Sequence, residues 1–359
     1  PAEREIETVD PAGPDAAPIA FPRERIGEYL TFVRDGAVLE PRFDADAAKG
    51  ILEPLLGETE QEGRDATFSF SGSRASVVPA VQGRTVEWGP LLGALPGQLT
   101  DVRGPRVLPV GYVGRDPELT TEEAEKAGIR EPVGEFTVAV GADGRAQSMI
   151  ASLAGHFIPA GGSFSMAEVA GTVSGDTSAD AVATALFNAA FEAGAQDLVR
   201  TGRGVDGPAF PAGRDATASA DVGFRNGQAT GLVIDASGGG SSVTVRLWGT
   251  REYTVRVSTA PRSDVRRPQT RVVTTAGCTP DPGQDGFTAR VTRVVQRGDA
   301  TVSTDTVSST YAPQDRIECR VASPAPRDDD PAPPAAPGPG DPIRIPGLPE
   351  FRIPGVPGN

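Results

Sequence analysis

Few side chains in this chain are suited to nucleophilic catalysis. It has one histidine, His156, and two cysteines, Cys278 and Cys319. A serine or cysteine nucleophile needs a base, most often an imidazole, to take its proton. His156 precedes the apolar residues Phe157 and Ile158, a setting typical of a structural histidine. A single histidine is also too few for a zinc site built on histidines. We therefore predict no catalytic residue, no metal site and no cofactor.

Carboxylates are abundant enough to keep one enzymatic alternative open. The chain has 48 Asp and Glu residues, and glycoside hydrolysis needs only two of them, roughly 5–10 Å apart across a cleft. No spacing in the sequence singles out such a pair. A carboxylate-dependent hydrolase or transferase is therefore the least favoured of three hypotheses.

Two short motifs match functional patterns without the context that those functions need. Residues 202–207 read GxGxxG, but Pro208 follows and no helix pattern opens there, so we interpret them as a glycine-rich loop. Arg297-Gly298-Asp299 spells an adhesion tripeptide between two β-like segments, where Gly-Asp makes a turn. Neither motif is assigned a function.

The composition indicates an exported, turn-rich protein. Gly 44 and Pro 34 together exceed a fifth of the 359 residues, and the net charge of −14 argues against nucleic acid as a partner. Cys278 and Cys319 are an even pair, which suits an oxidising compartment and predicts a disulfide. Closing the loop between them would stabilise the fold by about 4 kcal/mol in the chain-entropy model.

The sequence contains no apolar segment long enough to span a membrane, and it begins with polar residues. We therefore expect an ectodomain whose signal or anchor lies in a segment absent from this chain. The expected location is extracellular or in the cell envelope, either secreted or membrane-anchored.

Local patterns predict helices and hairpins in the first two thirds. Asp35-Gly36 between apolar segments predicts a hairpin, and Thr120 with Glu123 forms a capping box at a helix start. The most regular helix is expected over about residues 178–194, with Ser178 as its cap. Its shared face, which we expect to be buried, consists of Val182, Leu186 and Ala189.

The last third reads as β structure followed by a tail. Alternating segments predict strands from Thr217 to Tyr311, and the two cysteines bracket the last of them. From Ser323 the chain is rich in Pro, Ala and Asp and lacks enough apolar residues to fold. Its closing repeat, residues 343–357, is an extended segment that could dock on a partner groove.

Several motifs together resemble a VanW-like protein with a preceding peptidoglycan-binding domain. Residues 66–70, 77–79, 82–88 and 119–124 are similar to that binding domain. Residues 158–165 resemble the VanW-like "PGetFSf" segment, and 185–190 resemble the end of its "CQVSTTLYNA" helix. Residues 213–217 and 221–226 are similar to its "GxDATV…DLxFxN" stretch. The resemblance covers roughly residues 40–260 and implies a bacterial cell-envelope protein.

The resemblance also locates candidate binding residues and two departures. It implies binding positions at Pro159, Gly161, Phe164, Asn188, Arg214 and Asp215. Where the family has a cysteine at the helix start, this chain has Asp180, and residues 205–210 lack the expected histidine. We expect Asp180 to act as a helix-terminus residue whose change to Asn lowers stability by up to about 1 kcal/mol. Taken alone, the segment around Asp215 reads as a polar surface cluster in which Asp215 caps its own turn.

These observations predict a multidomain α+β protein. The expected parts are a disordered linker (1–20), a peptidoglycan-binding-like α+β domain (21–131), a VanW-like α+β domain (132–260), a small disulfide-closed β-module (261–322) and a disordered Pro-rich tail (323–359). The leading hypothesis is non-catalytic binding of peptidoglycan or a related wall polymer. The alternative is a structural partner in an envelope complex, which contacts another envelope protein through its surface and tail repeat.

Overall fold

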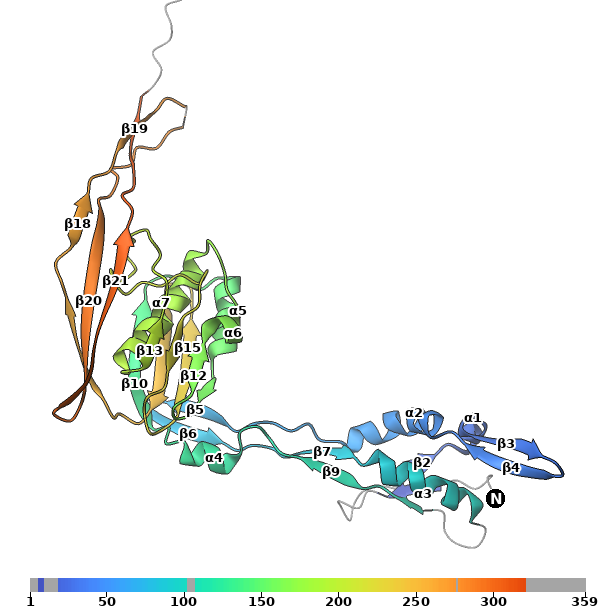
Figure 1. The fold of residues 1–359 in the computed structure, drawn as a ribbon. Coiled ribbons are helices and arrows are strands. Elements are labelled where there is room, and N and C mark those ends of the chain that lie inside the picture. Colours follow the sequence, from blue (N-terminus) through green and yellow to red (C-terminus); the bar gives the residue numbers. More distant parts are fainter. Residues whose placement is uncertain (1–5, 10–18, 102–106, 276, 321–359) are drawn as a thin grey trace, which may run out of the picture. The chain divides into compact units, whose positions relative to one another are not determined.

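The computed structural model describes residues 6–9, 19–101, 107–275 and 277–320 (Figure 1). Contacts divide the chain into two units. The larger comprises Pro1–Arg267 with Asp285–Gln314, and the smaller comprises Pro268–Gln284 with the residues from Asp315 onward. The larger unit contains both helices and strands, which confirms the predicted α+β fold class. The expected tail, 323–359, lies outside the described residues.

Two helices form the core of the N-terminal part. α2 (Ala45–Leu56) begins at Asp44, whose Oδ1 accepts hydrogen bonds from the N–H groups of Asp46 and Ala47. α3 (Trp88–Thr100) continues through Pro96. Short helical turns accompany them: η1 (Arg23–Arg25), α1 (Ile26–Tyr29) and η2 (Gly57–Thr59). The buried core is Phe21, Tyr29, Ala48, Ile51, Leu52, Leu56, Val86, Leu91, Leu95, Leu99, Leu108 and Val110.

Short strand pairs complete this part. The antiparallel pairs are β3 (Leu30–Asp35) with β4 (Val38–Phe43), β5 (Thr67–Ser71) with β6 (Arg74–Val78), and β7 (Gly83–Val86) with β9 (Tyr112–Arg115). The first pair confirms the hairpin predicted at Asp35-Gly36.

A further small sheet includes residues that the sequence indicated as linker. β1 (Ile6–Val9) pairs with β2 (Ile19–Phe21) and, in parallel, with β8 (Val107–Pro109). The prediction of a disordered linker over 1–20 is therefore wrong for the residues of β1. One of its partner strands lies about a hundred residues away in sequence, where no local pattern reveals it.

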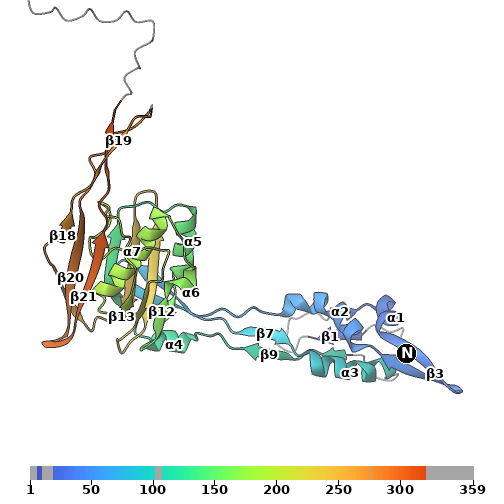
Figure 2. The same ribbon diagram turned by 45° about the horizontal axis from the view of Figure 1, so that its top comes forward.

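A four-stranded antiparallel sheet forms the centre of the following region. Its order is β10 (Glu131–Val138), β16 (Val243–Gly249), β15 (Leu232–Gly238) and β11 (Phe157–Ile158). The helices α5 (Gly144–Leu153) and α7 (Thr177–Glu192) pack against it, and α6 (Met166–Ala170) packs on α5 (Figure 2). A smaller sheet has the order β12 (Ser163–Ser165), β14 (Gly223–Arg225), β13 (Gln196–Val199).

α7 is the central helix of this core. Val182, Leu186 and Ala189 are fully buried, as predicted, and the burial extends around the whole helix from Ala179 to Phe191. Its cap is Asp176 rather than Ser178, so that prediction is wrong. The Asp176 carboxylate accepts from two backbone N–H groups of the first turn and carries the negative charge that a helix N-terminus favours.

The β5–β6 hairpin and α4 (Thr121–Lys126) join a separate small core. Phe70 stacks on Trp248 of β16 with ring centroids 4.5 Å apart, and Phe68 stacks on Phe157 at 6.0 Å. α4 begins with the predicted capping box of Thr120 and Glu123. Through these contacts, the β5–β6 hairpin and α4 pack on the four-stranded sheet.

The C-terminal strands divide between the two units. β20 (Gly286–Arg297) pairs with β17 (Thr254–Thr259), β18 (Ser263–Arg266) and β21 (Ala300–Tyr311), all in the larger unit. The smaller unit holds β19 (Thr270–Val273), parallel to β22 (Arg316–Cys319). The self-contained β-module expected over 261–322 is therefore not a single unit, because the β20–β21 hairpin packs on the core around α7.

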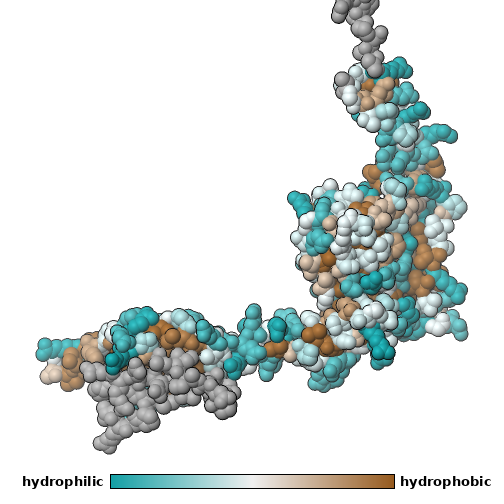
Figure 3. All heavy atoms as spheres, turned by 180° about the vertical axis from the view of Figure 1, so that it is seen from behind, coloured by the Kyte–Doolittle hydropathy of each residue, from teal (hydrophilic) through white to brown (hydrophobic). Residues whose placement is uncertain are grey.

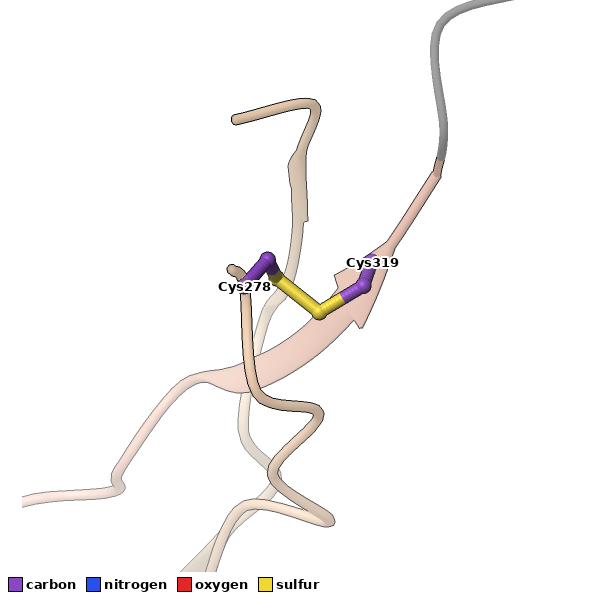
Figure 4. Close-up of a disulfide and its surroundings, with 2 residues drawn as sticks. All are labelled: Cys278 and Cys319. Carbon is purple, nitrogen blue, oxygen red and sulfur yellow. A yellow bond between two sulfur atoms is a disulfide. The ribbon is translucent and has the colours of Figure 1, made fainter. Parts of the chain in front are cut away.

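The predicted disulfide is present in the smaller unit. Cys278 and Cys319 are bonded, with their Cα atoms 5.7 Å apart (Figure 4). The bond ties the loop after β19 to β22, so it closes the same small sheet that the parallel pairing forms.

Candidate functional site

The six predicted binding residues lie in two separate places. Pro159 and Gly161 belong to the connection from β11 to β12, and Phe164 lies in β12. Asn188 lies on α7, and Arg214 and Asp215 lie in the loop between β13 and β14. The structure therefore does not gather the six residues into one site.

The turn between β11 and β12 is held by a buried asparagine. Asn226 Nδ2 donates to the carbonyl oxygen of Pro159 at 3.0 Å, and the N–H of Gly161 donates to the carbonyl oxygen of Asn226 at 2.9 Å. Gly161 has φ +74°, a backbone conformation that favours glycine. Pro159 and Gly161 thus shape this turn through their backbone, with Pro159 exposed at the surface.

Phe164 is a core residue rather than a surface contact. Its side chain is 5% exposed, and its ring packs on Phe224 at 5.1 Å and against His156 at 5.3 Å. Burial lowers the pKa of the His156 imidazole, because desolvation disfavours the charged form. Phe164 therefore places the single histidine at the base of the turn.

Asp215 lies at the centre of a buried polar cluster. Its Oδ1 accepts from the hydroxyls of Tyr311 at 2.6 Å and Ser309 at 2.7 Å, and its Oδ2 accepts from the N–H of Arg203 at 2.8 Å. The Arg200 guanidinium lies 3.8 Å from the same carboxylate. The interpretation of Asp215 as a surface residue that caps its own turn is therefore wrong.

Asn188 and Arg214 hold the same loop against α7. Asn188 Nδ2 donates to the carbonyl oxygens of Thr184 at 2.7 Å and Arg214 at 2.9 Å. The Arg214 guanidinium donates to Glu192 at 3.2 Å and lies over the ring of Phe191. Asn188 and Asp215 are buried supports, whereas the Arg214–Glu192 pair is partly exposed.

Asp180, where the resemblance places a cysteine, makes more contacts than a helix-terminus residue needs. Its Oδ2 accepts from Arg203 Nε at 2.8 Å, and its Oδ1 accepts from the N–H of Ala218 at 2.9 Å. Arg203 lies over the ring of Phe210 at 3.8 Å. Asp180 is 9% exposed. The limit of about 1 kcal/mol expected for Asp180→Asn considers only the helix terminus and does not include this ion pair.

Sequence reasoning missed the residues that complete the Asp215 cluster. Arg200, Ser309 and Tyr311 lie in segments read only as loop and strand, and two of them are more than ninety residues from Asp215. The only sequence feature that points to this cluster is the alternation of β21, which places Ser309 and Tyr311 on one face of the strand. It could not reveal which partner that face contacts.

One groove of about 800 Å3 lies beside β11, and we call it the β11 groove. Its lining comes from four segments: residues 65–67, 118–127, 155–160 and 229–231. Pro159 is the only one of the six predicted binding residues among them. The groove therefore combines residues near β5 and α4 with residues at the edge of the four-stranded sheet.

The ionic groups of the β11 groove are mostly engaged. Asp65 Oδ1 accepts from the N–H groups of Glu118 and Leu119, and Glu123 belongs to the capping box of α4. His156 is favoured in its neutral form by burial. Thr230 Oγ1 is buried without a hydrogen-bond partner in the described part of the chain. Such a lining suits a ligand with hydroxyl or amide groups and an apolar face.

The described residues indicate neither a metal centre nor a membrane span. Within 6–9, 19–101, 107–275 and 277–320, no three His, Cys, Asp or Glu side chains are placed to hold a metal ion. In the same ranges no helix has the length and hydrophobicity needed to cross a bilayer.

Comparison with known families identifies two regions. Residues 21–106 match the family described as "Putative peptidoglycan binding domain", and residues 180–248 match the family described as "VanW like protein". This order confirms the resemblance that the motifs indicated. No curated protein and no solved structure matches the chain. The two matches suggest the cell envelope, and the first supports a cell-wall polymer as a partner.

Proposed function

We propose that this chain, a peptidoglycan-binding domain followed by a VanW-like domain, binds peptidoglycan or a related wall polymer without cleaving it. The observation that carries the proposal is the lining of the β11 groove. Residues 65–67 come from the first matched region and residues 229–231 from the second. A groove shared by both regions gives the two domains a common ligand.

The chemistry of the groove favours the glycan strand as the bound part. Phe157, Pro159 and Ala160 supply apolar surface, while His156 supplies a neutral polar group. Sugar rings have apolar faces and hydroxyl edges, so they suit a lining of this kind better than a charged ligand does. The carboxylates of Asp65 and Glu123 already accept hydrogen bonds from backbone N–H groups, so fewer of their acceptor positions are open to a ligand.

The proposal of a non-catalytic role rests on Asp180. A carboxylate at the start of α7 that accepts from both Arg203 and Ala218 is already ion-paired and held in place. It is a far poorer attacking group than a thiolate in the same place. We also propose that the chain works outside the cytoplasm, secreted or held by an anchor; the Cys278–Cys319 bond supports an oxidising compartment.

Sedimentation with purified peptidoglycan sacculi tests the proposal. Ala160 is exposed and lines the β11 groove, so Ala160→Trp should fill the groove without disturbing the core. Ala151 on α5 is also exposed but lies outside the groove, and Ala151→Trp is the matched control. We expect wild type and Ala151→Trp to co-sediment and Ala160→Trp to remain largely in the supernatant.

Two results would contradict the proposal. Equal sedimentation of Ala160→Trp and Ala151→Trp would remove the groove as the binding site, and no sedimentation of the wild type would remove wall binding itself. The supernatant is also analysed for soluble wall fragments. Their release by the wild type would favour the carboxylate-dependent hydrolase or transferase.

One observation favours the alternative of a structural partner in an envelope complex. The β3–β4 hairpin exposes four large apolar side chains at its end, those of Phe32, Val33, Val38 and Leu39. Figure 3 shows hydrophobic atoms at the surface of this part. Surface of this kind often marks a contact with another protein. The closing repeat that the same hypothesis invoked lies outside the described residues.

A further inference from the structure

The strand β20 is the central strand of its sheet, with β17 and β18 along one edge and β21 along the other (Figure 1). Phe287, Val291 and Val295 are buried on one side of β20, whereas Arg290 is exposed. Residues paired across strands, and alternate residues along one strand, point to the same side of a sheet. The register therefore identifies the side chains that share the exposed side with Arg290. We call this side the outer face, and on β20 it consists of Thr288, Arg290, Thr292 and Val294.

Three exposed arginines follow one another along the outer face at equal intervals. Arg256 of β17 pairs with Val294. Arg290 lies on β20 itself, and Arg266 of β18 pairs with Gly286. Measured along β20, each interval is the length of four residues, which at about 3.4 Å per residue is about 14 Å. The intervals suit a linear ligand that runs along β20 and presents an anion at each arginine.

Rows of hydroxyl groups lie between the arginines. By register the first row is Ser258, Thr292 and Thr306, and the second is Ser263, Thr288 and Thr310. Thr292 Oγ1 and Thr306 Oγ1 lie 2.8 Å apart and share a hydrogen bond. Thr288 is 8% exposed, but Thr306 and Thr310 on β21 are open to solvent. Cations and rows of hydroxyls thus alternate along the outer face.

The arginines of the outer face have no carboxylate partner. Within the described part of the chain, Arg256, Arg266 and Arg290 form no ion pair, whereas the arginines of β20 on the buried side are both paired. Arg290 donates to the hydroxyl of Ser263 at 3.3 Å, which leaves its charge uncompensated. Asp264 is the one carboxylate on β17, β18 and β20, and three arginines outweigh it. On a chain of net charge −14, this face is a local cationic surface that attracts an anion.

We propose that the outer face binds a linear anionic polymer, a chain of acyclic polyol units joined by phosphodiesters. Its phosphates pair with Arg256, Arg290 and Arg266, because a guanidinium donates to two oxygens of one phosphate. The polyol hydroxyls form hydrogen bonds with the two rows of Ser and Thr. The described residues of this face include no aromatic side chain on which a sugar ring could pack, so an acyclic unit fits better. The outer face shares no residue with the β11 groove and does not depend on wall binding there.

Biolayer interferometry with the full chain immobilised tests this site. The probe is poly(glycerol phosphate), and the comparison polymers are polygalacturonate, polyglutamate and dextran of similar length. Polygalacturonate keeps the charge and the hydroxyls but consists of rings, and polyglutamate keeps only the charge. We expect poly(glycerol phosphate) to bind and both carboxylate polymers to bind at least about fivefold more weakly. Dextran, which is neutral, should not bind, and salt should weaken the binding of poly(glycerol phosphate).

Matched variants place the binding on the outer face. Arg290→Gln removes the middle cation and should weaken poly(glycerol phosphate) by about two- to fivefold. Arg145→Gln is its control, because Arg145 is exposed at the start of α5 and its loss changes the net charge equally. Thr306→Val removes an outer hydroxyl and keeps the side-chain shape, and it should weaken binding by at least about twofold. Thr259→Val is its control, since Thr259 is exposed on β17 but pairs with Val291, on the other side of the sheet.

Three outcomes would overturn the proposal: no binding of poly(glycerol phosphate), equal binding of either carboxylate polymer, or equal weakening by Arg290→Gln and Arg145→Gln. The sedimentation assay is run on the same variants with sacculi freed of phosphodiester polymers by hydrofluoric acid. Arg290→Gln should co-sediment with these sacculi as the wild type does. Failure of the outer face and failure of wall binding at the β11 groove are thereby distinguished.

Discussion

The β3–β4 and β20–β21 hairpins have the same local design and opposite surroundings. Each is a pair of antiparallel strands joined by a tight turn with a glycine at positive φ, Gly36 in one and Gly298 in the other. Apart from partly buried residues at its base, the first is exposed along both strands. The second buries Phe287, Val291 and Tyr311. Its burial depends on contacts far away in the sequence.

Those contacts are polar as well as apolar. The Arg293 side chain is 2% exposed and donates to the carbonyl oxygens of Phe191 and Ala195, at the end of α7. These are carbonyls of the kind left unpaired at a helix C-terminus, where a positive charge is also favourable. Asp305 on the partner strand pairs with Arg293 at 2.9 Å. The hairpin thus supplies a C-terminal cap for the central helix.

The comparison shows what a hairpin pattern leaves undetermined. Alternating residues and a Gly turn fix pairing and register, but they do not say whether either face finds a partner. Substitutions in the two hairpins should therefore have very different effects on the free energy of unfolding.

The largest effect is expected from Arg293→Met. The variant keeps most of the side-chain volume but removes the guanidinium donor from the carbonyls of Phe191 and Ala195 and from the Asp305 carboxylate, which keeps only the Ser303 hydroxyl. Breaking such a buried set should lower the free energy of unfolding by about 3 kcal/mol. Chemical denaturation followed by circular dichroism measures it.

Arg290→Met is the control for this prediction, because Arg290 lies on the same strand and is exposed. It should change stability by less than about 0.5 kcal/mol. Equal effects of the two substitutions would mean that the charge of the strand, and not the cap on α7, stabilises the hairpin.

A smaller effect is expected from Tyr311→Phe, at the other end of the hairpin. The substitution removes the hydroxyl that donates to Asp215 and accepts from the N–H of Gly213. The loss should be about 1–2 kcal/mol in the free energy of unfolding. Chemical denaturation near pH 8 measures it. If the Tyr311 hydroxyl were exposed to water in the folded protein, Tyr311→Phe would cause no loss.

Tyr311 also gives this end of the hairpin a pH dependence. Burial and the bond to Asp215 raise the pKa of the Tyr311 phenol from 10.0 to about 12. Because the folded value lies above the unfolded one, the stabilisation is complete below pH 10 and is lost as the pH rises towards 12. The wild type should lose stability over this window more steeply than Tyr311→Phe. Parallel curves would show that the phenol is accessible to water.

Local chemistry in the sequence was enough to predict much of the fold. The turn at Asp35-Gly36, the capping box of α4 and the buried face of α7 all depend on residues a few positions apart. The disulfide is predicted by an even pair of cysteines that bracket one β segment of the sequence. Each of these features needs no knowledge of how distant segments pack.

The candidate site was less predictable because its parts come from distant segments. Asp215 reads as a turn residue until Ser309 and Tyr311 are placed beside it. The β11 groove combines residues 65–67 with residues 229–231, and no local pattern links them. For the same reason, the sequence pattern places residues 285–314 in the predicted module of 261–322, whereas they belong to the larger unit. The hairpin they form is local, whereas its packing on α7 is not.

The smallest effect is expected in the exposed hairpin, which is the strictest check on the comparison. Phe32 and Leu39 are 58% and 64% exposed, so Phe32→Ser and Leu39→Ser remove little buried surface. The free energy of unfolding should change by no more than about 0.5 kcal/mol for either. A loss comparable to that of Tyr311→Phe would mean that these side chains are covered in solution, either by another copy or by part of the same chain. Sedimentation velocity at several concentrations separates those two cases, because only pairing between copies depends on concentration.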